Sequence, residues 1–180
     1  MINKFYYKKS ISSKEINKEF SVLSEQIKKW RVPAGFLQFI FYTLAELFAN
    51  IKEHSKAKKV LIESKKENKN FLIKVSDNGI GLRNSYITHS ILPKDDNSAI
   101  EFALSGLSIK NSRERGYGLY SIRQLVEMLK GKMEIKTGKS QAEITKGEIK
   151  FRKNLKKEKG VSILIKTKIQ NNVDIYKVLK

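Results

Sequence analysis

The residues best suited to do chemistry lie on one line of a very apolar segment. Glu46 and Asn50 are four positions apart within residues 34–54, so on a helix they share a face. The same line also includes Thr43, Glu53 and His54. A buried carboxylate and a buried amide need polar partners. The line therefore marks either a hydrogen-bonded core pair or one wall of a binding site.

Two glycine-containing runs could form other walls of such a site. Asp77, Gly79 and Gly81 follow an alternating strand pattern, where glycines allow close approach of the backbone. This run is either an ordinary glycine turn or a ligand-binding loop. Gly116 and Gly118 open an amphipathic helix, and a helix N-terminus favours an anion. Together the three motifs predict a pocket that accepts an anionic ligand.

Periodicity and capping predict the elements that position these motifs. Ser12 and Glu15 have capping-box spacing, so we expect a helix over residues 13–30 whose apolar stripe faces the core or a dimer partner. Further helices are expected over residues 34–54 and 118–129. Strands are expected at residues 4–8, 60–64, 71–76, 133–137, within 142–152 and at 161–169, with a basic turn over residues 153–159.

Residues 83–115 form a long connection in which the sequence predicts one short helix. That helix begins with the capping-box spacing of Ser98 and Glu101 and ends near Gly106. A connection of this length in a compact domain is typical of a functional lid or a mobile loop.

Composition limits the classes of protein that the chain can belong to. It has 180 residues and no Cys, which excludes disulfide scaffolds and Cys-ligated metal sites. The formal charge of +19 comes from 37 basic and 18 acidic residues, scattered along the chain. Scatter favours a solvated basic surface, with nucleic-acid binding as the alternative. The first 30 residues have no apolar leader segment, and residues 34–51 suit a buried helix better than a membrane span, so we expect a cytoplasmic protein that does not enter the membrane.

In order and spacing, the three motifs resemble the boxes of the Bergerat-fold (GHKL) ATPases, the superfamily of histidine kinases, DNA gyrase, heat-shock chaperones and mismatch-repair ATPases. Residues 46–55 resemble the N box, 75–82 the first glycine box and 115–122 the second. The resemblance covers about residues 34–169 of a single domain, 1–180. It implies an α+β fold, a two-layer sandwich with a mixed, mostly antiparallel sheet, helices on one face and an ATP lid over about 82–115.

The resemblance also implies ATP and Mg²⁺ as cofactors and gives roles to individual residues. Asn50 would bind the magnesium ion, Glu46 would orient or deprotonate the attacking water or hydroxyl, and Asp77 would accept a hydrogen bond from the adenine amino group. The other nucleotide contacts that it implies are Gly79, Gly81, Lys110, Arg113, Arg115, Gly116, Tyr117, Gly118 and Leu119. Glu114 departs from the second glycine box, which has a glycine there in many members.

Stand-alone domains of this kind resemble the anti-sigma-factor serine kinases. The resemblance implies a signalling regulator that phosphorylates a protein partner on Ser or Thr, or that hydrolyses ATP slowly. A self-sufficient sensor histidine kinase is not expected, because no His precedes residue 54. Two alternatives stay open, an ATP-gated protein-binding module without turnover and an ATP-gated nucleic-acid-binding protein. A homodimer is also left open.

Overall fold

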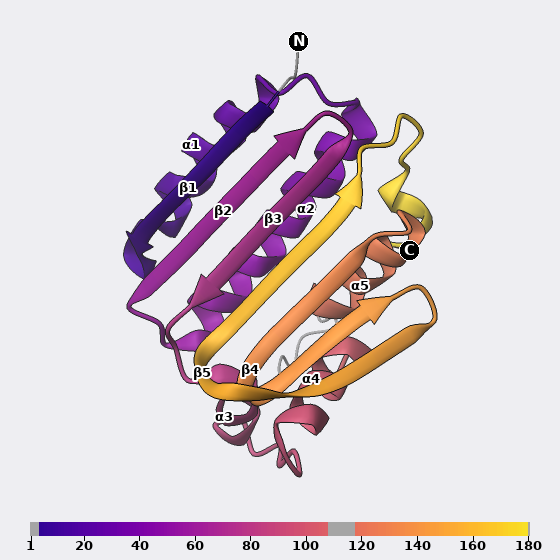
Figure 1. Ribbon diagram of the computed structural model, residues 1–180. Coiled ribbons are helices and arrows are strands. Elements are labelled where there is room, and N and C mark those ends of the chain that lie inside the picture. Colours follow the sequence, from indigo (N-terminus) through magenta and orange to yellow (C-terminus); the bar gives the residue numbers. More distant parts are fainter. Residues whose placement is uncertain (1–3, 108–117, 180) are drawn as a thin grey trace.

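The computed structural model describes residues 4–107 and 118–179, which form one open sheet and the helices packed on it (Figure 1). The strand order is β1-β2-β3-β5-β4. Their bounds are β1 Lys4–Ser12, β2 Lys59–Glu67, β3 Asn70–Asp77, β4 Lys132–Thr145 and β5 Glu148–Lys168. All four ladders between these strands are antiparallel. The predicted α+β sandwich is confirmed, with a more uniformly antiparallel sheet than the resemblance implied.

The three longer helices cover one face of the sheet, and no helix of the described residues covers the other face (Figure 1). The covering helices are α1 Ile16–Lys28, α2 Ala34–Asn50 and α5 Gly118–Met128. Two shorter helices, α3 Gly81–Ile87 and α4 Asp96–Ser105, lie at the end of the sheet where β3 finishes. Single helical turns occur at Ser13–Glu15, Ile51–Ser55 and Ile175–Lys177.

Helix α2 is the centre of the core because it is apolar on nearly every side. Phe36, Phe39, Ile40 and Leu44 are completely inaccessible to solvent. Among the described residues, Ala34–Ser55 is the one helical span long and apolar enough to cross a membrane by length and composition. Its burial against the sheet and the neighbouring helices is that of the core helix of a folded domain.

The start of the chain folds as its capping signal predicts, with a longer strand than expected. The Ser12 backbone N–H donates to Glu15 Oε2 over 3.0 Å, and Ser12 Oγ caps the turn that leads into α1. Strand β1 continues to Ser12, beyond the predicted end at residue 8, because it pairs with β2 over its whole length.

As far as residue 107, where its described part ends, the connection after the first glycine box contains two helices where the sequence predicted one. Helix α3 was missed because it is only seven residues long and begins directly at Gly81 without a side-chain cap. The start predicted for the next helix was also wrong. Its N-cap is Asp95, whose carboxylate accepts from Ser98 N at 2.8 Å, so Ser98 lies inside the first turn.

The predicted basic turn over residues 153–159 is wrong, because this segment belongs to β5. The β4–β5 hairpin turns instead at Lys146 and Gly147, where Gly147 has a φ of 77°. The Lys-rich segment lies opposite a shift in strand register between Thr137 and Ser140. Such an irregularity bends a strand without ending it, which is why the sequence pattern was mistaken for a turn.

Candidate active site

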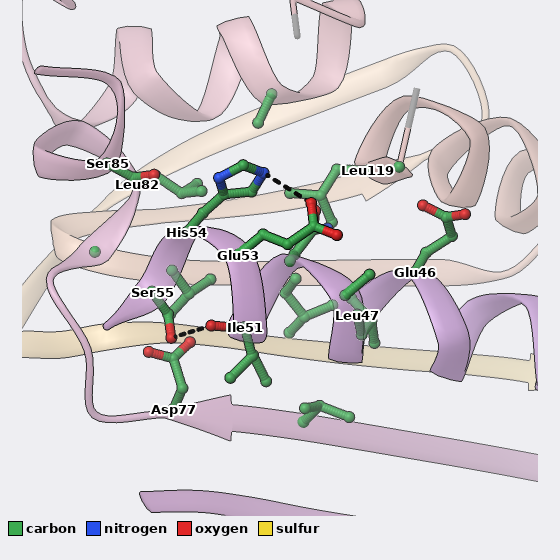
Figure 2. Close-up of a pocket in the computed structure, with 18 of the residues that line it drawn as sticks. Glu46, Leu47, Ile51, Glu53, His54, Ser55, Asp77, Leu82, Ser85 and Leu119 are labelled. Atoms are coloured by element: carbon green, nitrogen blue, oxygen red, sulfur yellow. Dashed lines mark hydrogen bonds and ion pairs between the residues drawn. The ribbon is translucent and has the colours of Figure 1, made fainter. Parts of the chain in front are cut away.

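A cavity of about 340 Å³ lies between the C-terminal half of α2, helix α3, the start of α5, the end of β3 and the part of β5 that includes Val161 and Ile163. Its lining includes six of the predicted site residues, Glu46, Asn50, Asp77, Gly81, Gly118 and Leu119. Lys110, Arg113, Arg115, Gly116 and Tyr117 lie outside the described residues. Figure 2 shows Glu46 and Asp77 toward opposite ends of this pocket, so it is long enough to separate two ends of one ligand.

Glu46 and Asn50 meet the start of α5 at one end of the pocket. A Cβ atom placed on Gly118 would lie 3.1 Å from Glu46 Oε2 and 3.2 Å from Asn50 Nδ2, so a larger residue there would press on both side chains. One turn before Glu46, Tyr42 faces the same helix and shares a side-chain hydrogen bond with Ser121. Burial raises the pKa of Tyr42, and the nearby Glu46 carboxylate adds to this effect. These contacts fix the polar face of α2 against the N-terminal turn of α5.

The last turn of this long helix is π-helical, over Ile51–Ser55, and ends at Lys56 in the left-handed conformation. Asn50, Glu53 and His54 all line the pocket, together with Ile51 and Ser55. A regular α-helix would not turn so many consecutive side chains toward one cavity, and π turns are frequent at functional sites. The His54 ring also packs edge-on against His89 of the predicted lid, with ring centres 5.8 Å apart.

Asp77 forms the other end of the pocket, where β3 finishes. Its side chain is 8% exposed, and Oδ1 accepts from the backbone N–H of Gly79 at 2.7 Å. Burial raises the pKa of Asp77 to about 6, against the opposing effect of backbone N–H groups from Gly79 and Val161. The carboxylate is therefore mostly ionised at neutral pH and can accept one more hydrogen bond from a ligand.

The loop after Asp77 is held tightly to the end of α2. The Ile80 N–H donates to the carbonyl of Ser55 at 2.8 Å, and Asn78 Oδ1 accepts from the backbone N–H groups of Lys58 and Lys59. Gly79 does not line the pocket itself. It packs behind Asp77, where an added Cβ would overlap the carbonyl oxygen of Ser55. The first glycine motif therefore works mainly by letting this loop approach the helix, rather than by exposing the backbone of Gly79 to a ligand.

Three residues that the sequence did not suggest also shape the site. Gly160, with a φ of 84°, lies against Asp77, and a Cβ there would overlap the carbonyl oxygen of Asp77. Thr137 Oγ1 joins α3 to β5 by accepting from Leu82 N–H and donating to Gly160 O. Ser85 lines the pocket at 4% exposure, and its Oγ has no hydrogen-bond partner among the described residues. No sequence signal pointed to them, because Gly160 falls between a predicted turn and a predicted strand and lies inside β5 only in the structure.

The donor set suits a magnesium-bound triphosphate. Mg²⁺ prefers few protein oxygen ligands together with phosphate and water, and one amide oxygen is available from Asn50. The N-terminus of the eleven-residue helix α5 points phosphate-binding amides toward the same place. The pocket volume lies within the range of small-molecule sites.

Comparison with protein families supports this arrangement. Residues 37–168 match the family described as histidine kinase-, DNA gyrase B- and HSP90-like ATPase. The match includes most of α2, strands β2 and β3, helix α5 and the β4–β5 hairpin. The chain matched no curated protein. Because the family match covers well over half of its residues, the chain belongs to the histidine kinase-, DNA gyrase B- and HSP90-like ATPases and is an ATP-binding domain of that family.

Proposed function

We propose that this protein is a cytoplasmic signalling regulator that binds Mg·ATP and transfers the terminal phosphoryl group to Ser or Thr of a protein partner, or slowly to water. The observation that carries the proposal is the meeting of Glu46 and Asn50 with Gly118 at one end of a pocket whose other end is Asp77. This separation suits a nucleotide with its base at Asp77 and its phosphates at α5.

Each residue has a distinct task in this proposal. Asp77 accepts a hydrogen bond from the adenine amino group, and the apolar walls Val161 and Ile163 cover the base. Asn50 supplies an amide oxygen to the magnesium ion, which neutralises phosphate charge when it is bound. Glu46 accepts the proton of the attacking hydroxyl or water as the new P–O bond forms and ADP departs. From sequence alone, Lys110, Arg113 and Arg115, with Gly116 and Tyr117, are assigned to the phosphates.

The experiment that tests the proposal compares Asn50→Ala with Glu46→Gln in calorimetric ATP titrations and in turnover assays. Asn50→Ala should weaken Mg·ATP binding at least about tenfold, equivalent to about 1.4 kcal/mol, because it removes a metal ligand. Glu46→Gln should keep the affinity within about twofold and lower turnover at least about a hundredfold, as expected for loss of a general base. Unchanged Mg·ATP binding in Asn50→Ala would show that the proposed site is wrong.

Incubation with γ-labelled ATP and cell extract then identifies the acceptor. Label on another protein, lost with Glu46→Gln, supports phosphoryl transfer to a partner. Label released only as free phosphate supports slow hydrolysis. If wild type and Glu46→Gln bind ATP equally and neither turns it over, the ATP-gated binding module is the correct alternative.

A further inference from the structure

A second concave site lies at the opposite end of the sheet from the nucleotide pocket, and we call it the basic basin. It has a volume of about 860 Å³ and is lined by six lysines, Lys65, Lys130, Lys132, Lys146, Lys166 and Lys168. Strand β3 begins at the basin with Asn70 and ends at the nucleotide pocket with Asp77, a distance of about 23 Å at roughly 3.3 Å per residue. The two sites are therefore separate.

The charge of the basin exceeds what the Lys-rich composition alone would give. Basic residues outnumber acidic ones 37 to 18 over the whole chain, whereas the basin has six lysines and one carboxylate, Glu67. That carboxylate is already bound by Lys65 at 2.6 Å and Lys4 at 3.8 Å. The basin is thus a strongly positive concavity with no acidic group left to balance it.

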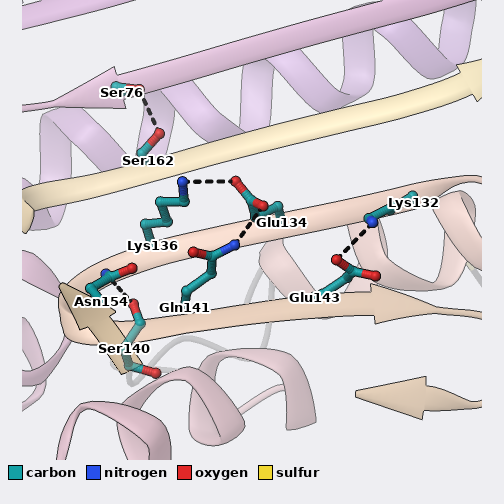
Figure 3. Close-up of polar contacts among 9 residues, drawn as sticks. All are labelled: Ser76, Lys132, Glu134, Lys136, Ser140, Gln141, Glu143, Asn154 and Ser162. Atoms are coloured by element: carbon teal, nitrogen blue, oxygen red, sulfur yellow. Dashed lines mark hydrogen bonds and ion pairs between the residues drawn. The ribbon is translucent and has the colours of Figure 1, made fainter. Parts of the chain in front are cut away.

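Four of the six lysines have no carboxylate partner among the residues that the structure describes. Lys65 pairs with Glu67, and Lys132 pairs with Glu143 at 2.7 Å on the uncovered face of the sheet (Figure 3). Within residues 4–107 and 118–179, no carboxylate lies within ion-pair distance of Lys130, Lys146, Lys166 or Lys168. All four are exposed, so they are available to an anion from solution. Lys166 is moreover the direct cross-strand neighbour of Lys132, and since Glu143 pairs with Lys132, the charge of Lys166 stays available to an external anion.

Strand register extends the basin into a row across the uncovered face. Tyr6, Lys65, Leu72, Lys166 and Lys132 are successive cross-strand partners, so their side chains share that face. Four strand spacings make the row roughly 19 Å long. Tyr6, at the β1 end of this row, is 56% exposed. An exposed aromatic ring in line with three lysines, of which Lys166 has no carboxylate partner among the described residues, offers a stacking surface for a base beside contacts for phosphates.

We infer that the basic basin and this row bind single-stranded nucleic acid, with Lys166 and Lys168 contacting the phosphodiester backbone and Tyr6 stacking on a base. This occupant matches the charge of the basin, the length of the row and its exposed aromatic ring. The inference does not depend on the proposed kinase or ATPase activity, because the site lies at the other end of the sheet.

The test is fluorescence anisotropy of a labelled dodecamer of deoxythymidine, without ATP, over a salt series starting at ~50 mM. Lys166→Gln/Lys168→Gln should weaken binding at least about tenfold and reduce the slope of log K against log salt by about 1.4, because each lost single-strand phosphate contact contributes about 0.7. The matched control is Lys14→Gln/Lys18→Gln, which removes the same charge from exposed positions on the helix side and should stay within about twofold. Tyr6→Ala should weaken binding about tenfold without changing the slope.

Several results would overturn the inference. Failure of wild type to bind at ~50 mM salt removes it, and an equal loss in both double variants means that only net charge matters. An affinity for polyglutamate equal to that for the dodecamer would point to an acidic protein partner instead. If the protein preferred a duplex to the single strand, and Tyr6→Ala kept that preference, stacking of Tyr6 on a single-stranded base would be excluded. Unchanged melting temperature and Mg·ATP affinity in the variants show that the fold and the nucleotide pocket are intact.

Discussion

At the scale of single residues, Asp77 makes the stability of the protein without nucleotide depend on pH. Its pKa is raised to about 6 by burial, so between about pH 4 and 6 the folded state binds a proton that the unfolded state has lost. This group should therefore lower the free energy of unfolding as pH rises through that window, by roughly 3 kcal/mol for a shift of about two units. The measurement is urea unfolding at several pH values between 4 and 7.

The matched variant for this prediction is Asp77→Asn, which keeps the shape of the side chain and cannot ionise. The difference in unfolding free energy between this variant and the wild-type protein isolates Asp77 from every other titrating group. That difference should favour the variant progressively as pH rises to 6 and then level off. A difference independent of pH would mean that Asp77 is not the buried acid described above.

At Gly160, the loss of stability caused by a substitution can be divided into backbone strain and steric clash. Gly160→Ala should destabilise the protein by at least about 3 kcal/mol, because left-handed strain adds to a clash with the carbonyl oxygen of Asp77. Gly147→Ala is the control, since Gly147 is also left-handed and an added Cβ there meets nothing within 4 Å. It should cost roughly 1 kcal/mol from backbone strain alone. Chemical denaturation of both variants measures the difference, and equal costs would contradict the close contact at Asp77.

At the scale of elements, Lys66 joins β2 to the end of α1. It is 7% exposed, donates to Trp30 O at 2.7 Å and lies 5.3 Å from the centre of the Phe5 ring. Lys66→Met keeps the apolar stem but leaves a buried carbonyl unpaired, so it should cost about 2 kcal/mol. Denaturant unfolding measures the loss.

The neighbouring lysine is the control for Lys66, because successive strand residues point to opposite faces. Lys65 lies on the uncovered face and pairs there with Glu67, an exposed ion pair that contributes little to stability. Lys65→Met should therefore leave the unfolding free energy nearly unchanged. If both variants lost equal stability, the effect would come from strand propensity or charge, and the anchoring of α1 by Lys66 would be wrong.

The elements that could be predicted from the sequence are those whose sequence patterns lie within a few neighbouring residues. Helix α2 and the turn at Asp77 carry periodicity, caps or glycines within a few residues, so both were predicted together with their place in one pocket. Helix α3 is too short to show periodicity. The roles of Thr137 and Gly160 arise from contacts with Leu82 and Asp77, far apart in the chain, and no local pattern announces such contacts.

At the scale of the whole molecule, we predict that the chain unfolds as one domain. The family match begins at residue 37, yet β1 and α1 precede it and share the core, β1 through Ile11 and α1 through Ile16, Leu23 and Ile27. A shared core favours a single cooperative transition. Tryptophan fluorescence follows Trp30, beside α1, while far-ultraviolet circular dichroism follows the whole fold. The two curves should coincide, and an earlier fluorescence transition would mean that the N-terminal segment unfolds separately.

Nucleotide binding should in turn raise the stability of this single unit, because the pocket joins α2, α3, α5, the end of β3 and the middle of β5. A ligand at 100 times its dissociation constant stabilises the folded state by about 2.7 kcal/mol, which corresponds to roughly 5–11 °C in melting temperature for a chain of this size. Differential scanning fluorimetry measures this shift for wild type with Mg·ATP, for wild type with ATP and a chelator, and for Asn50→Ala with Mg·ATP. The comparison separates the contribution of the metal ion from that of the adenine base. We expect the full shift only for wild type with Mg·ATP. An equal shift in Asn50→Ala would place the metal elsewhere, whereas no shift in any sample would show that the pocket does not bind ATP.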